Sequence, residues 1–381
     1  MDSMASGAQF HLDKAELGQI VLVLQGGGAL GAYQAGVYEA LDEAGVEPDW
    51  VIGTSIGAIN AGIIAGNQPE MRLPRLCEFW DRIRHDPLTR AIAETPGWGA
   101  MAATAMTMWR GVPAFFKPNP WAFLGVGLTP ESAGYYSTAP LERTLREVID
   151  PEVLGSSSVR LTVGAANVRT AEMRYFDSRD TPLTIRHIMA SGALPPAFPA
   201  IRIDGELYWD GGILSNTPVE AVFDDNPRRS GLVFTVNIWQ PNGQEPADMV
   251  RVVSRQKDLQ YASRATAQVQ RQKQIHRLRH VIAELAREVP DERRDSPEIR
   301  RLAAFGCLTR MHVVRLLAPT LAGEDHTKDI DFSAAGIRGR WSAGYADAMQ
   351  VLKQQPWSHQ FDRLEGFILH ETEAGAILSE G

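Results

Sequence analysis

A serine between two glycines carries the strongest chemical signal in this sequence. The motif Gly53-x-Ser55-x-Gly57 follows a strand-like apolar stretch, residues 50–52, and precedes a helix-like stretch, residues 56–65. A serine at such a sharp strand-to-helix turn is a nucleophile elbow, because small neighbours let the chain turn tightly while the hydroxyl stays accessible. The spacing predicts Ser55 as a nucleophile supported by Gly53 and Gly57, with a simple glycine-rich turn as the alternative.

A second glycine-rich segment stands at a comparable point earlier in the chain. Gly26, Gly27 and Gly28, followed by Gly31, come directly after the strand-like residues 20–24. Successive backbone N–H groups at the start of a helix form a site for negative charge. The charge could be the oxyanion of a tetrahedral acyl intermediate or a phosphate group.

The same glycines also match the G-x-G-x-x-G pattern of dinucleotide-binding folds. In those folds an acidic residue ends the second strand. Here Asp49 precedes the second strand, and the Ser55 motif stands at its end. No G-x-x-x-x-G-K-[ST] motif is present either. We therefore disfavour the dinucleotide and P-loop interpretations.

A third motif, Asp210-Gly211-Gly212, follows an apolar stretch that ends at Trp209. Alone, an Asp followed by two glycines is typical of a tight turn. Together with the other two motifs it completes a set: a nucleophile, an oxyanion site and a carboxylate that can accept a proton. An ordinary carboxylate is a weak base toward a serine hydroxyl, so we expect burial to raise the pKa of Asp210.

These three motifs, in this order, resemble the patatin-like phospholipase family. The resemblance also takes in Ser191-Gly192-Ala193-Leu194-Pro195 and Phe198-Pro199, which are similar to a loop near the family's active site. It covers about residues 18–240. It implies a three-layer α/β/α hydrolase with a mainly parallel central sheet, an aromatic-rich cap and a helical insertion.

The family resemblance also implies a reaction and its residues. It implies a lipid acyl hydrolase that uses a Ser–Asp dyad without histidine, metal or cofactor. By position, Ser55 is the nucleophile and Asp210 the base. The oxyanion hole falls on Gly27 and Gly28 with Gly26 beside them. Leu30 departs from the family, because many members carry Arg or Lys there, and we therefore assume no preference for anionic headgroups.

Several other elements must position these motifs. A helix is expected over 29–44 and further strands over 159–165, 174–176, 205–209 and 231–239. We divide the chain into a catalytic core, residues 18–240, with a cap at 67–135, and a basic helical insertion at 241–311. A final strand and helix, 312–355, complete the core, and 356–381 form a loosely held tail.

The cap and the insertion have unusual compositions. Between residues 95 and 130 only Arg110 and Lys117 are charged, and tryptophan, methionine and phenylalanine are abundant. This predicts short helical pieces that either pack as ordinary core, gather acyl chains or meet a membrane surface. Residues 251–279 hold eight Lys or Arg against one acid, Asp258. This helix is either a solvated face, a site of attraction to anionic lipid or a protein interface.

Histidines offer a rival catalytic interpretation. Six of them follow Asp210, so a Ser–Asp–His triad is available from His276, His280, His312, His326, His359 or His370. Ser55 stands early for that fold and no HGGG-type segment is present, which favours the dyad. His276 and His280, one helical turn apart, could bind metal, but on a basic helix we expect them to be solvated.

Composition limits the remaining function classes. The chain has 381 residues, 44% of them hydrophobic, and a net charge of −8. A general nucleic-acid binder would usually be basic. The two cysteines, Cys77 and Cys307, exclude a disulfide framework and favour a reducing compartment. With no signal-like start and no long apolar run, we expect a cytoplasmic protein, in contact with the inner membrane surface at most.

The sequence thus predicts a lipase or phospholipase A that cleaves lipid acyl esters through an acyl-enzyme on Ser55. Its partner is a lipid or other acyl ester, not nucleic acid. One alternative is an esterase or thioesterase on other acyl esters, such as hydroxyalkanoate oligomers. A catalytically silent acyl-chain or membrane-binding module is the other.

Overall fold

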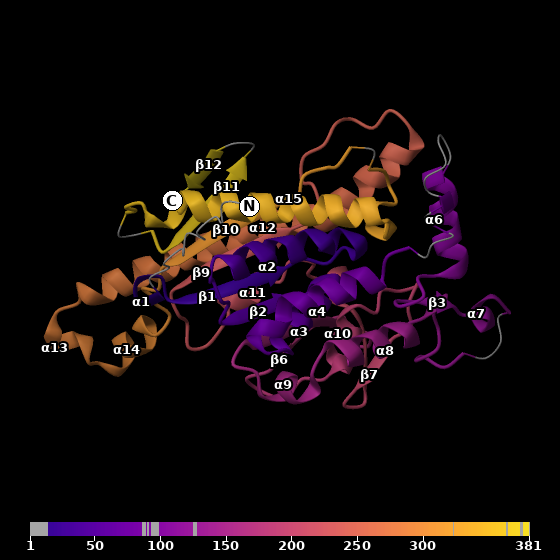
Figure 1. The fold of residues 1–381 in the computed structure, drawn as a ribbon. Coiled ribbons are helices and arrows are strands. Elements are labelled where there is room, and N and C mark those ends of the chain that lie inside the picture. The colour runs from indigo at the N-terminus through magenta and orange to yellow at the C-terminus, as the bar shows by residue number, and fades with distance from the viewer. Residues whose placement is uncertain are drawn as a thin grey trace.

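A computed structural model describes residues 14–85, 89, 91–92, 99–124, 128–322, 324–362, 365–373 and 376–380. A large mixed sheet lies at the centre of the molecule (Figure 1). Its described strands run in the order β12-β11-β10-β9-β1-β2-β5-β8-β7, with β6 also paired to β5. The strands are β1 Gln19–Leu24, β2 Trp50–Gly53, β5 Arg160–Asn167, β6 Met173–Asp177, β7 Ile201–Ile203, β8 Glu206–Asp210, β9 Gly231–Asn237, β10 Met311–Leu317, β11 Phe367–Glu373 and β12 Ala376–Glu380.

The middle of the sheet is parallel. β1 pairs in parallel with β2 and β9, β2 with β5, and β10 with both β9 and β11. Leu24 is in register with Gly53 on one side and Val236 on the other. The carboxyl ends of β1, β2 and β9 therefore meet at one edge, where the glycine run and the serine motif follow.

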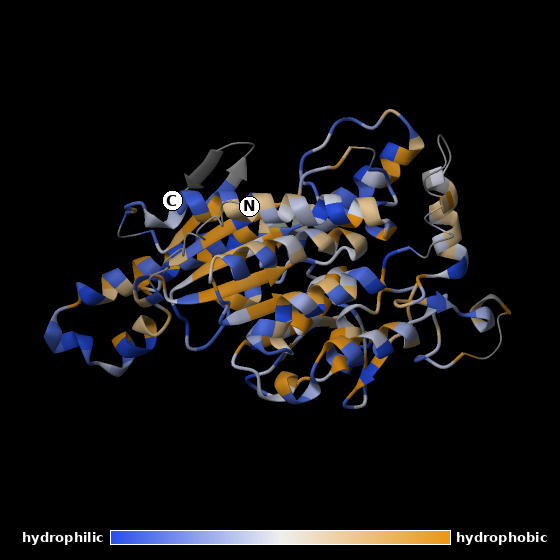
Figure 2. Ribbon diagram, in the orientation of Figure 1, coloured by the Kyte–Doolittle hydropathy of each residue, from blue (hydrophilic) through white to orange (hydrophobic). Residues whose placement is uncertain are grey.

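Both faces of the sheet are covered. Along β1, Ile20, Leu22 and Leu24 join one apolar cluster, while Val21 and Val23 join another on the opposite face. Such a strand is apolar throughout because neither side chain row meets water. Figure 2 shows these strands as the hydrophobic centre of the molecule. The predicted three-layer arrangement with a mainly parallel sheet is confirmed.

The helices form the outer layers. Those that contribute to the first apolar cluster are α2 Ala32–Glu43, α3 Ile56–Ala65, α4 Pro69–Arg82, α8 Ala139–Val148, α9 Pro151–Ser156, α10 Ile185–Ser191 and α15 Ala334–Gln354. Helix α11 Glu220–Phe223 contributes to the cluster on the opposite face, and α12 Met249–Arg287 contributes Val269 to that cluster and Ala262 to the first. The remaining helices are α1 Lys14–Leu17, α6 Gly99–Arg110, α7 Pro120–Leu124, α13 Asp291–Arg294 and α14 Pro297–Ala303, and the short 3₁₀ helices are η1 Gly28–Gly31, η2 Gly211–Ile213, η3 Lys328–Ile330 and η4 Pro356–Ser358.

Helices α2 and α15 are packed closely although they stand at opposite ends of the sequence. A Cβ added to Gly344 would lie 2.0 Å from the Tyr33 carbonyl oxygen, so the two backbones touch there. The Tyr33 hydroxyl donates to Asp347 at 2.7 Å, and the Tyr345 hydroxyl donates to Glu43 at 2.6 Å. The first and last large helices therefore form one unit of the outer layer.

The C-terminal part of the sheet differs from the sequence prediction. The strand predicted at 312–317 is present as β10, but it is not the last strand, because β11 pairs with it in parallel. Residues 367–373 therefore extend the sheet and do not form a loose tail. The pattern of β11 hid it, since His370 and Glu371 interrupt its apolar run.

The basic helix also differs from the prediction of a separate insertion. Val269 of α12 belongs to the apolar cluster on the second face of the sheet, so the helix covers that face. His276 and His280, which we expected to be solvated, are only 2% and 4% exposed. They point from α12 into this layer, where His276 Nε2 lies 2.8 Å from the Thr309 carbonyl oxygen.

The predicted cap is made of short pieces, as expected where it is described. Helices α6 and α7 flank a two-stranded ribbon of β3 Lys117–Pro118 and β4 Tyr136–Ser137. Residues 95–98 and 125–127 lie outside the described part. Helix α4, which falls within the predicted cap at 67–135, packs against α2 and α3 as a regular core helix. The other domain boundaries stay predictions.

Candidate active site

Ser55 stands at the turn between β2 and α3. Its φ and ψ of 56° and −124° lie in a region that residues other than glycine rarely adopt. The turn is tight on both sides: a Cβ added to Gly57 would lie 2.2 Å from the Leu24 carbonyl oxygen, and one added to Gly53 would lie 2.3 Å from that of Gly57. These close approaches require glycine at both positions, as expected for a nucleophile elbow.

A second loop holds the strained serine in place. The Ser55 N–H lies 3.0 Å from the Ser191 Oγ and 3.2 Å from the Ser191 carbonyl oxygen. The Ser191 hydroxyl in turn donates to the Gly164 carbonyl oxygen at 2.6 Å. The segment that begins at Ser191 thus lies where the sequence prediction put it, against the serine turn.

Asp210, the last residue of β8, lies beside Ser55. Its backbone N–H donates to the Ala193 carbonyl oxygen at 3.0 Å, which ties β8 to the Ser191 loop. Its Oδ1 accepts a hydrogen bond from the Gly212 N–H at 2.7 Å, and the Ser55 side chain lies beside the carboxylate in the same cavity wall. Burial raises the pKa of Asp210 to about 6, although the Ser55 hydroxyl and the Gly212 N–H lower it.

The glycine run forms the third side of the site. Gly28 has a φ of +55°, and a Cβ added to it would lie 2.2 Å from the Asp329 carbonyl oxygen. Gly27 and Gly28 donate no backbone hydrogen bond among those of the described residues. Their N–H groups can therefore serve an oxyanion. Leu30 is buried, 4% exposed.

Gly26 requires a correction to the predicted oxyanion hole. Its N–H donates to the Asn216 carbonyl oxygen at 3.1 Å, so this donor is already in use. Its carbonyl oxygen accepts hydrogen bonds from Asn216 Nδ2 at 3.0 Å and Trp239 Nε1 at 2.7 Å. Gly26 is therefore an anchor of the loop and not one of its oxyanion donors.

Sequence reasoning missed Asn216 and Trp239 as supports of the glycine loop. Gln25 completes this support, since its Oε1 accepts from the backbone N–H groups of Ile238 and Trp239 at 2.6 and 3.2 Å. Asn216 closely follows the Asp210 motif, and Trp239 ends an apolar strand. Neither residue belongs to a motif that would predict a role at the site. Their role depends on contacts between segments about two hundred residues apart.

The other predicted glycines shape the same turns. A Cβ added to Gly31 would lie 2.6 Å from Cγ1 of Ile56, which lets η1 approach the start of α3. One added to Gly211 would lie 2.4 Å from the Gly164 carbonyl oxygen, and one added to Gly212 would lie 2.7 Å from Asn216 Oδ1. All of the motif residues singled out from the sequence are thus brought together.

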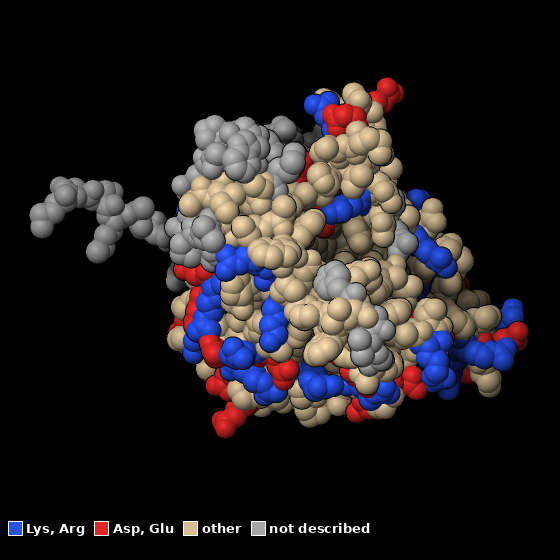
Figure 3. Space-filling model, turned by 90° about the vertical axis from the view of Figure 1, so that its right-hand side faces the viewer, with Lys and Arg blue, Asp and Glu red and all other residues tan. Residues whose placement is uncertain are grey.

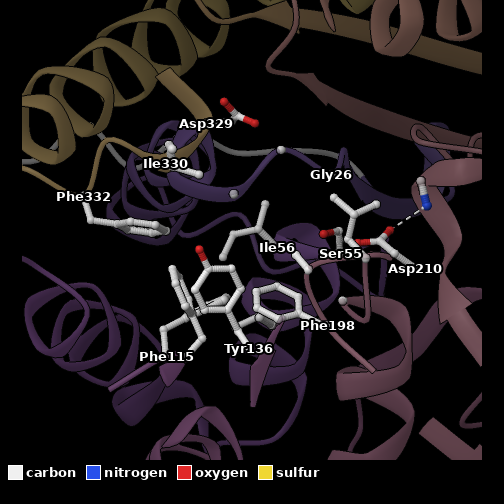
Figure 4. Close-up of a pocket in the computed structure, with 18 of the residues that line it drawn as sticks. Gly26, Ser55, Ile56, Phe115, Tyr136, Phe198, Asp210, Asp329, Ile330 and Phe332 are labelled. Carbon is white, nitrogen blue, oxygen red and sulfur yellow. Dashed lines mark hydrogen bonds between the residues drawn. The ribbon is translucent and has the colours of Figure 1, made fainter. Parts of the chain in front are cut away.

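An apolar cavity of about 290 Å³ opens at Ser55 and Asp210. Figure 4 shows the serine and the carboxylate on one side and aromatic rings on the other. The Phe116 and Tyr136 ring centroids are 4.9 Å apart, and those of Phe116 and Phe198 are 5.6 Å apart. The apolar side chains in the wall are Ile56, Ile59, Met108, Phe115, Phe116, Tyr136, Leu194, Ala197, Phe198, Trp239, Tyr261, Ile330 and Phe332.

No described histidine lines this cavity. His312 and His370 instead stack on each other in β10 and β11, with Nδ1 and Nε2 3.1 Å apart. Desolvation lowers the pKa of His312 to about 4 and of His370 to about 3. Nor do the described side chains include three His, Cys, Asp or Glu grouped as a metal site.

Comparison with protein families agrees with this geometry. A family model described as patatin-like phospholipase matches residues 22–223, which is more than half of the chain. A second model, described as patatin phospholipase, matches residues 259–364.

Individual relatives are similar to this chain over part of its length. A patatin-like phospholipase domain-containing protein 6 from Mus musculus is 44% identical over 202 residues, which are 53% of this chain and 12% of that protein. A lysophospholipase nte1 from Aspergillus terreus is 25% identical over 246 residues, 59% of this chain and 14% of that protein. The chain thus spans a small part of these relatives' length. The solved structure of VipD from Legionella pneumophila aligns with a TM-score of 0.36 at 17% identity, covering 88% of this chain and 67% of that one.

Proposed function

The chain belongs to the patatin-like phospholipase family, and from that premise we propose that it is a serine hydrolase of lipid acyl esters. The observation that carries the proposal is the contact between Ser55 and Asp210 at the mouth of an apolar cavity. A nucleophile and its base stand together there, next to two free N–H groups, and the apolar wall suits an acyl chain.

The proposed reaction has two halves. In the first, Ser55 Oγ attacks the acyl carbonyl carbon while the hydroxyl proton passes to Asp210, and the N–H groups of Gly27 and Gly28 bind the resulting oxyanion. The intermediate then collapses, and the alcohol leaves with the proton from Asp210. In the second half, water attacks the acyl carbonyl carbon and gives a proton to Asp210. The second intermediate then collapses, Asp210 returns the proton to Ser55 Oγ, and the free acid leaves.

The electrostatics of Asp210 suit this role. A base works best when its pKa lies near the working pH. Burial raises the pKa of Asp210 to about 6, so the carboxylate is charged at neutral pH yet is a much stronger base than an exposed aspartate. The proposed mechanism needs no histidine between the two residues, because they lie side by side in the cavity wall.

The wall of the cavity favours a single acyl chain as the part of the substrate that enters. Its volume of about 290 Å³ is small, near the lower limit of about 300 Å³ for sites that bind drug-sized ligands. Phe115 and Phe116 are 8% and 7% exposed, so little of this wall meets open solvent. We infer that a headgroup stays outside while one chain is bound.

The cap supplies a surface through which the enzyme could take lipid from a membrane. Trp109, Trp121 and Leu124 are 76%, 60% and 66% exposed. Figure 3 shows mostly uncharged side chains over the described part of this end of the molecule and charged side chains of both signs along its lower edge. Exposed tryptophans are typical of membrane interfaces. We therefore propose that α6 and α7 rest on the lipid surface, with the cavity, which Met108 also lines, opening behind them.

The basic helix is a weaker candidate for this contact. Arg255 of α12 donates to the carbonyl oxygens of Gln240 and Pro241, and Arg279 donates to that of Phe223. These arginines bind backbone carbonyl groups of the protein itself.

None of the described helices combines the length and apolar character required to cross a bilayer. Location in the cytoplasm stays a prediction from the two free cysteines.

Hydrolysis of p-nitrophenyl esters of increasing acyl length tests the proposal directly. We expect wild-type activity to rise with chain length and Ser55→Ala to abolish it, together with labelling by a fluorophosphonate probe. Ser156→Ala, a change at an exposed serine on α9, is the matched control and should leave both unchanged. Activity confined to the shortest chains would indicate an esterase for small acids. Wild-type protein that neither turns over esters nor reacts with the probe would contradict the proposal.

A further inference from the structure

A segment from the C-terminal half of the chain closes part of the cavity. Residues 324–333, here called the strap, connect β10 to α15 and include η3. The Asp329 carbonyl oxygen lies directly over Gly28, so the strap rests on the oxyanion loop. Ile330 and Phe332 reach from it into the cavity wall (Figure 4).

Ring contacts place Phe332 at the end of an aromatic row. The Phe198 ring, in the loop that holds Ser55, is 6.3 Å from the Phe115 ring, and the Phe115 ring is 5.9 Å from the Phe332 ring. Figure 4 shows Phe332 on the opposite side of the cavity from Ser55. An acyl chain bound to Ser55 would therefore pass Phe198 and Phe115 before it meets Phe332, which is 2% exposed.

Two crossed ion pairs join the strap to α12. Lys257 Nζ lies 2.7 Å from the Asp329 carboxylate, and Lys328 Nζ lies 2.7 Å from the Asp258 carboxylate. On α12 and on the strap alike, a lysine is followed directly by an aspartate. Each lysine pairs with the aspartate of the other segment. A slip of the strap by one residue would bring like charges together, so the pairs define one register.

The ion pairs are partly buried, so they can hold the strap in place. The side chains of Lys328 and Asp258 are 6% and 11% exposed, whereas those of Lys257 and Asp329 are 30% and 22% exposed. Lys257 also donates to the His326 carbonyl oxygen at 2.8 Å. A pair that is largely removed from water is costly to break, because one charge is then left without its partner.

Contacts outside α12 fix both ends of the strap. The His85 N–H donates to the Phe332 carbonyl oxygen at 3.0 Å. Arg340 of α15, 3% exposed, donates to the Asp331 carbonyl oxygen at 3.0 Å and pairs with Glu324 at 3.1 Å. Ile330 and Phe332 thus lie between two anchors, one on α12 and one on α15.

We propose that the strap sets the acyl-chain length that this enzyme accepts. Ile330 and Phe332 form the end wall of the acyl site, and the crossed pairs of Lys257, Asp258, Lys328 and Asp329 hold that wall in position. The inference rests on the proposed acyl hydrolase function and adds its specificity-determining residues. It also gives α12 a role at the site, through Lys257 and Asp258.

Truncation of the end wall tests the first half of this proposal. In Phe332→Ala, the ratio of kcat/KM for long esters to that for short esters should rise by about tenfold, because space for further methylenes opens. Ile330→Ala, at a half-buried position, should change the ratio in the same direction and decides the matter if Phe332→Ala fails to fold. Phe198→Ala, near Ser55, is the control and should lower activity at all chain lengths. An unchanged ratio in folded variants that react with the fluorophosphonate would overturn the proposal.

Charge exchange tests the second half. Lys257→Asp and Asp329→Lys alone should each broaden the chain-length profile, and the double variant should restore it, since the pair is rebuilt with reversed sign. Arg271→Asp, an exposed change on the same helix, is the matched control. Single variants with the wild-type profile, or a double variant no better than either, would contradict a positioning role for this pair.

Binding without turnover separates this proposal from the proposed function. Calorimetric titration of Ser55→Ala and Ser55→Ala/Phe332→Ala with saturated fatty acids of increasing length needs no hydrolysis. The second variant should bind longer acids than the first. If both variants bind acids up to the same length, the end wall is refuted, even when the wild-type protein hydrolyses esters. If the two limits differ but the wild-type protein hydrolyses no ester, only the proposed hydrolase function is refuted.

Discussion

The Ser55 hydroxyl lies beside the carboxylate of Asp210 at a place where Asp210 is only 2% exposed. This proximity and this burial act on the carboxylate in opposite directions. Loss of hydration raises its pKa, while the Ser55 hydroxyl and the Gly212 N–H lower it. Burial prevails, so the carboxylate is a stronger base than an exposed aspartate, as the proposed mechanism requires.

The pH dependence of ester hydrolysis should report Asp210. Because burial raises its pKa to about 6, and only the charged form accepts a proton, kcat/KM should fall by about tenfold per pH unit below 6 and level off above it. A pH profile on one soluble ester measures this. His326→Gln should keep the same midpoint, and a midpoint that moves in this variant would implicate a histidine.

Asp210→Asn should remove activity but stabilise the fold. The pKa of Asp210 is raised from 3.8 to about 6 in the folded protein, so the folded state holds this proton more tightly than the unfolded state. The free energy of unfolding of the wild type therefore falls as pH rises between these two values. Asparagine does not ionise, and the variant should therefore gain about 2 to 3 kcal/mol above pH 6. Urea unfolding at high and low pH measures the difference, which should vanish below pH 4. A variant less stable than wild type at neutral pH would show that burial does not dominate.

Gly28→Ala should impair the oxyanion loop. The positive φ disfavours a side chain, and the added Cβ would lie 2.2 Å from the strap carbonyl of Asp329. We expect kcat to fall by about 10²- to 10³-fold, the loss typical of an oxyanion-hole donor. Gly45→Ala is the matched control, because Gly45 has a φ of +69° but nothing within 4 Å of an added Cβ. It should lose stability without losing turnover.

Vesicle binding should depend on the exposed tryptophans of the cap. Trp109→Ala and Trp121→Ala should each weaken binding to phospholipid vesicles by about tenfold, since each ring would leave the apolar interface. Co-sedimentation with vesicles measures this. Phe305→Ala changes a ring that is 64% exposed and should have no effect. Phe305 follows α14 in the sequence, and α14 lies at the opposite end of the molecule from α6 and α7 (Figure 1). Equal losses in all three variants would point to non-specific adsorption.

Sequence reasoning predicted the elements whose signals are local. The strand before Gly26, the turn at Ser55 and the helix that follows all stand within one segment of chain, and each has its own residue pattern. Asp210 was found because its motif follows in the expected order. The helix predicted over 29–44 begins instead as η1 and continues as α2, since the glycine run tightens its first turn.

The features that the sequence concealed depend on distant partners. The motif predicted Gly26 as an oxyanion donor, but its N–H donates to the carbonyl oxygen of Asn216, a residue far away in the sequence. His276 was expected in water because its own helix is basic, whereas the partner that buries it lies in another part of the chain. The strap carries only a Lys-Asp pair as its signal, and that pair acquires meaning only opposite the Lys-Asp pair of α12.

The contact between α2 and α15 has a consequence for the birth of the chain on the ribosome. Tyr33 and Gly36 of α2 have no lasting cover until Asp347 and Trp341 emerge, some three hundred residues later. β1 likewise acquires its neighbour β9 about two hundred residues later, and β9 acquires β10 only after α12 has been made. Long-range pairing of this kind is slow and leaves apolar surface exposed in the meantime. The nascent chain should therefore depend on chaperones until α15 has left the ribosome, and its native fold should form only then.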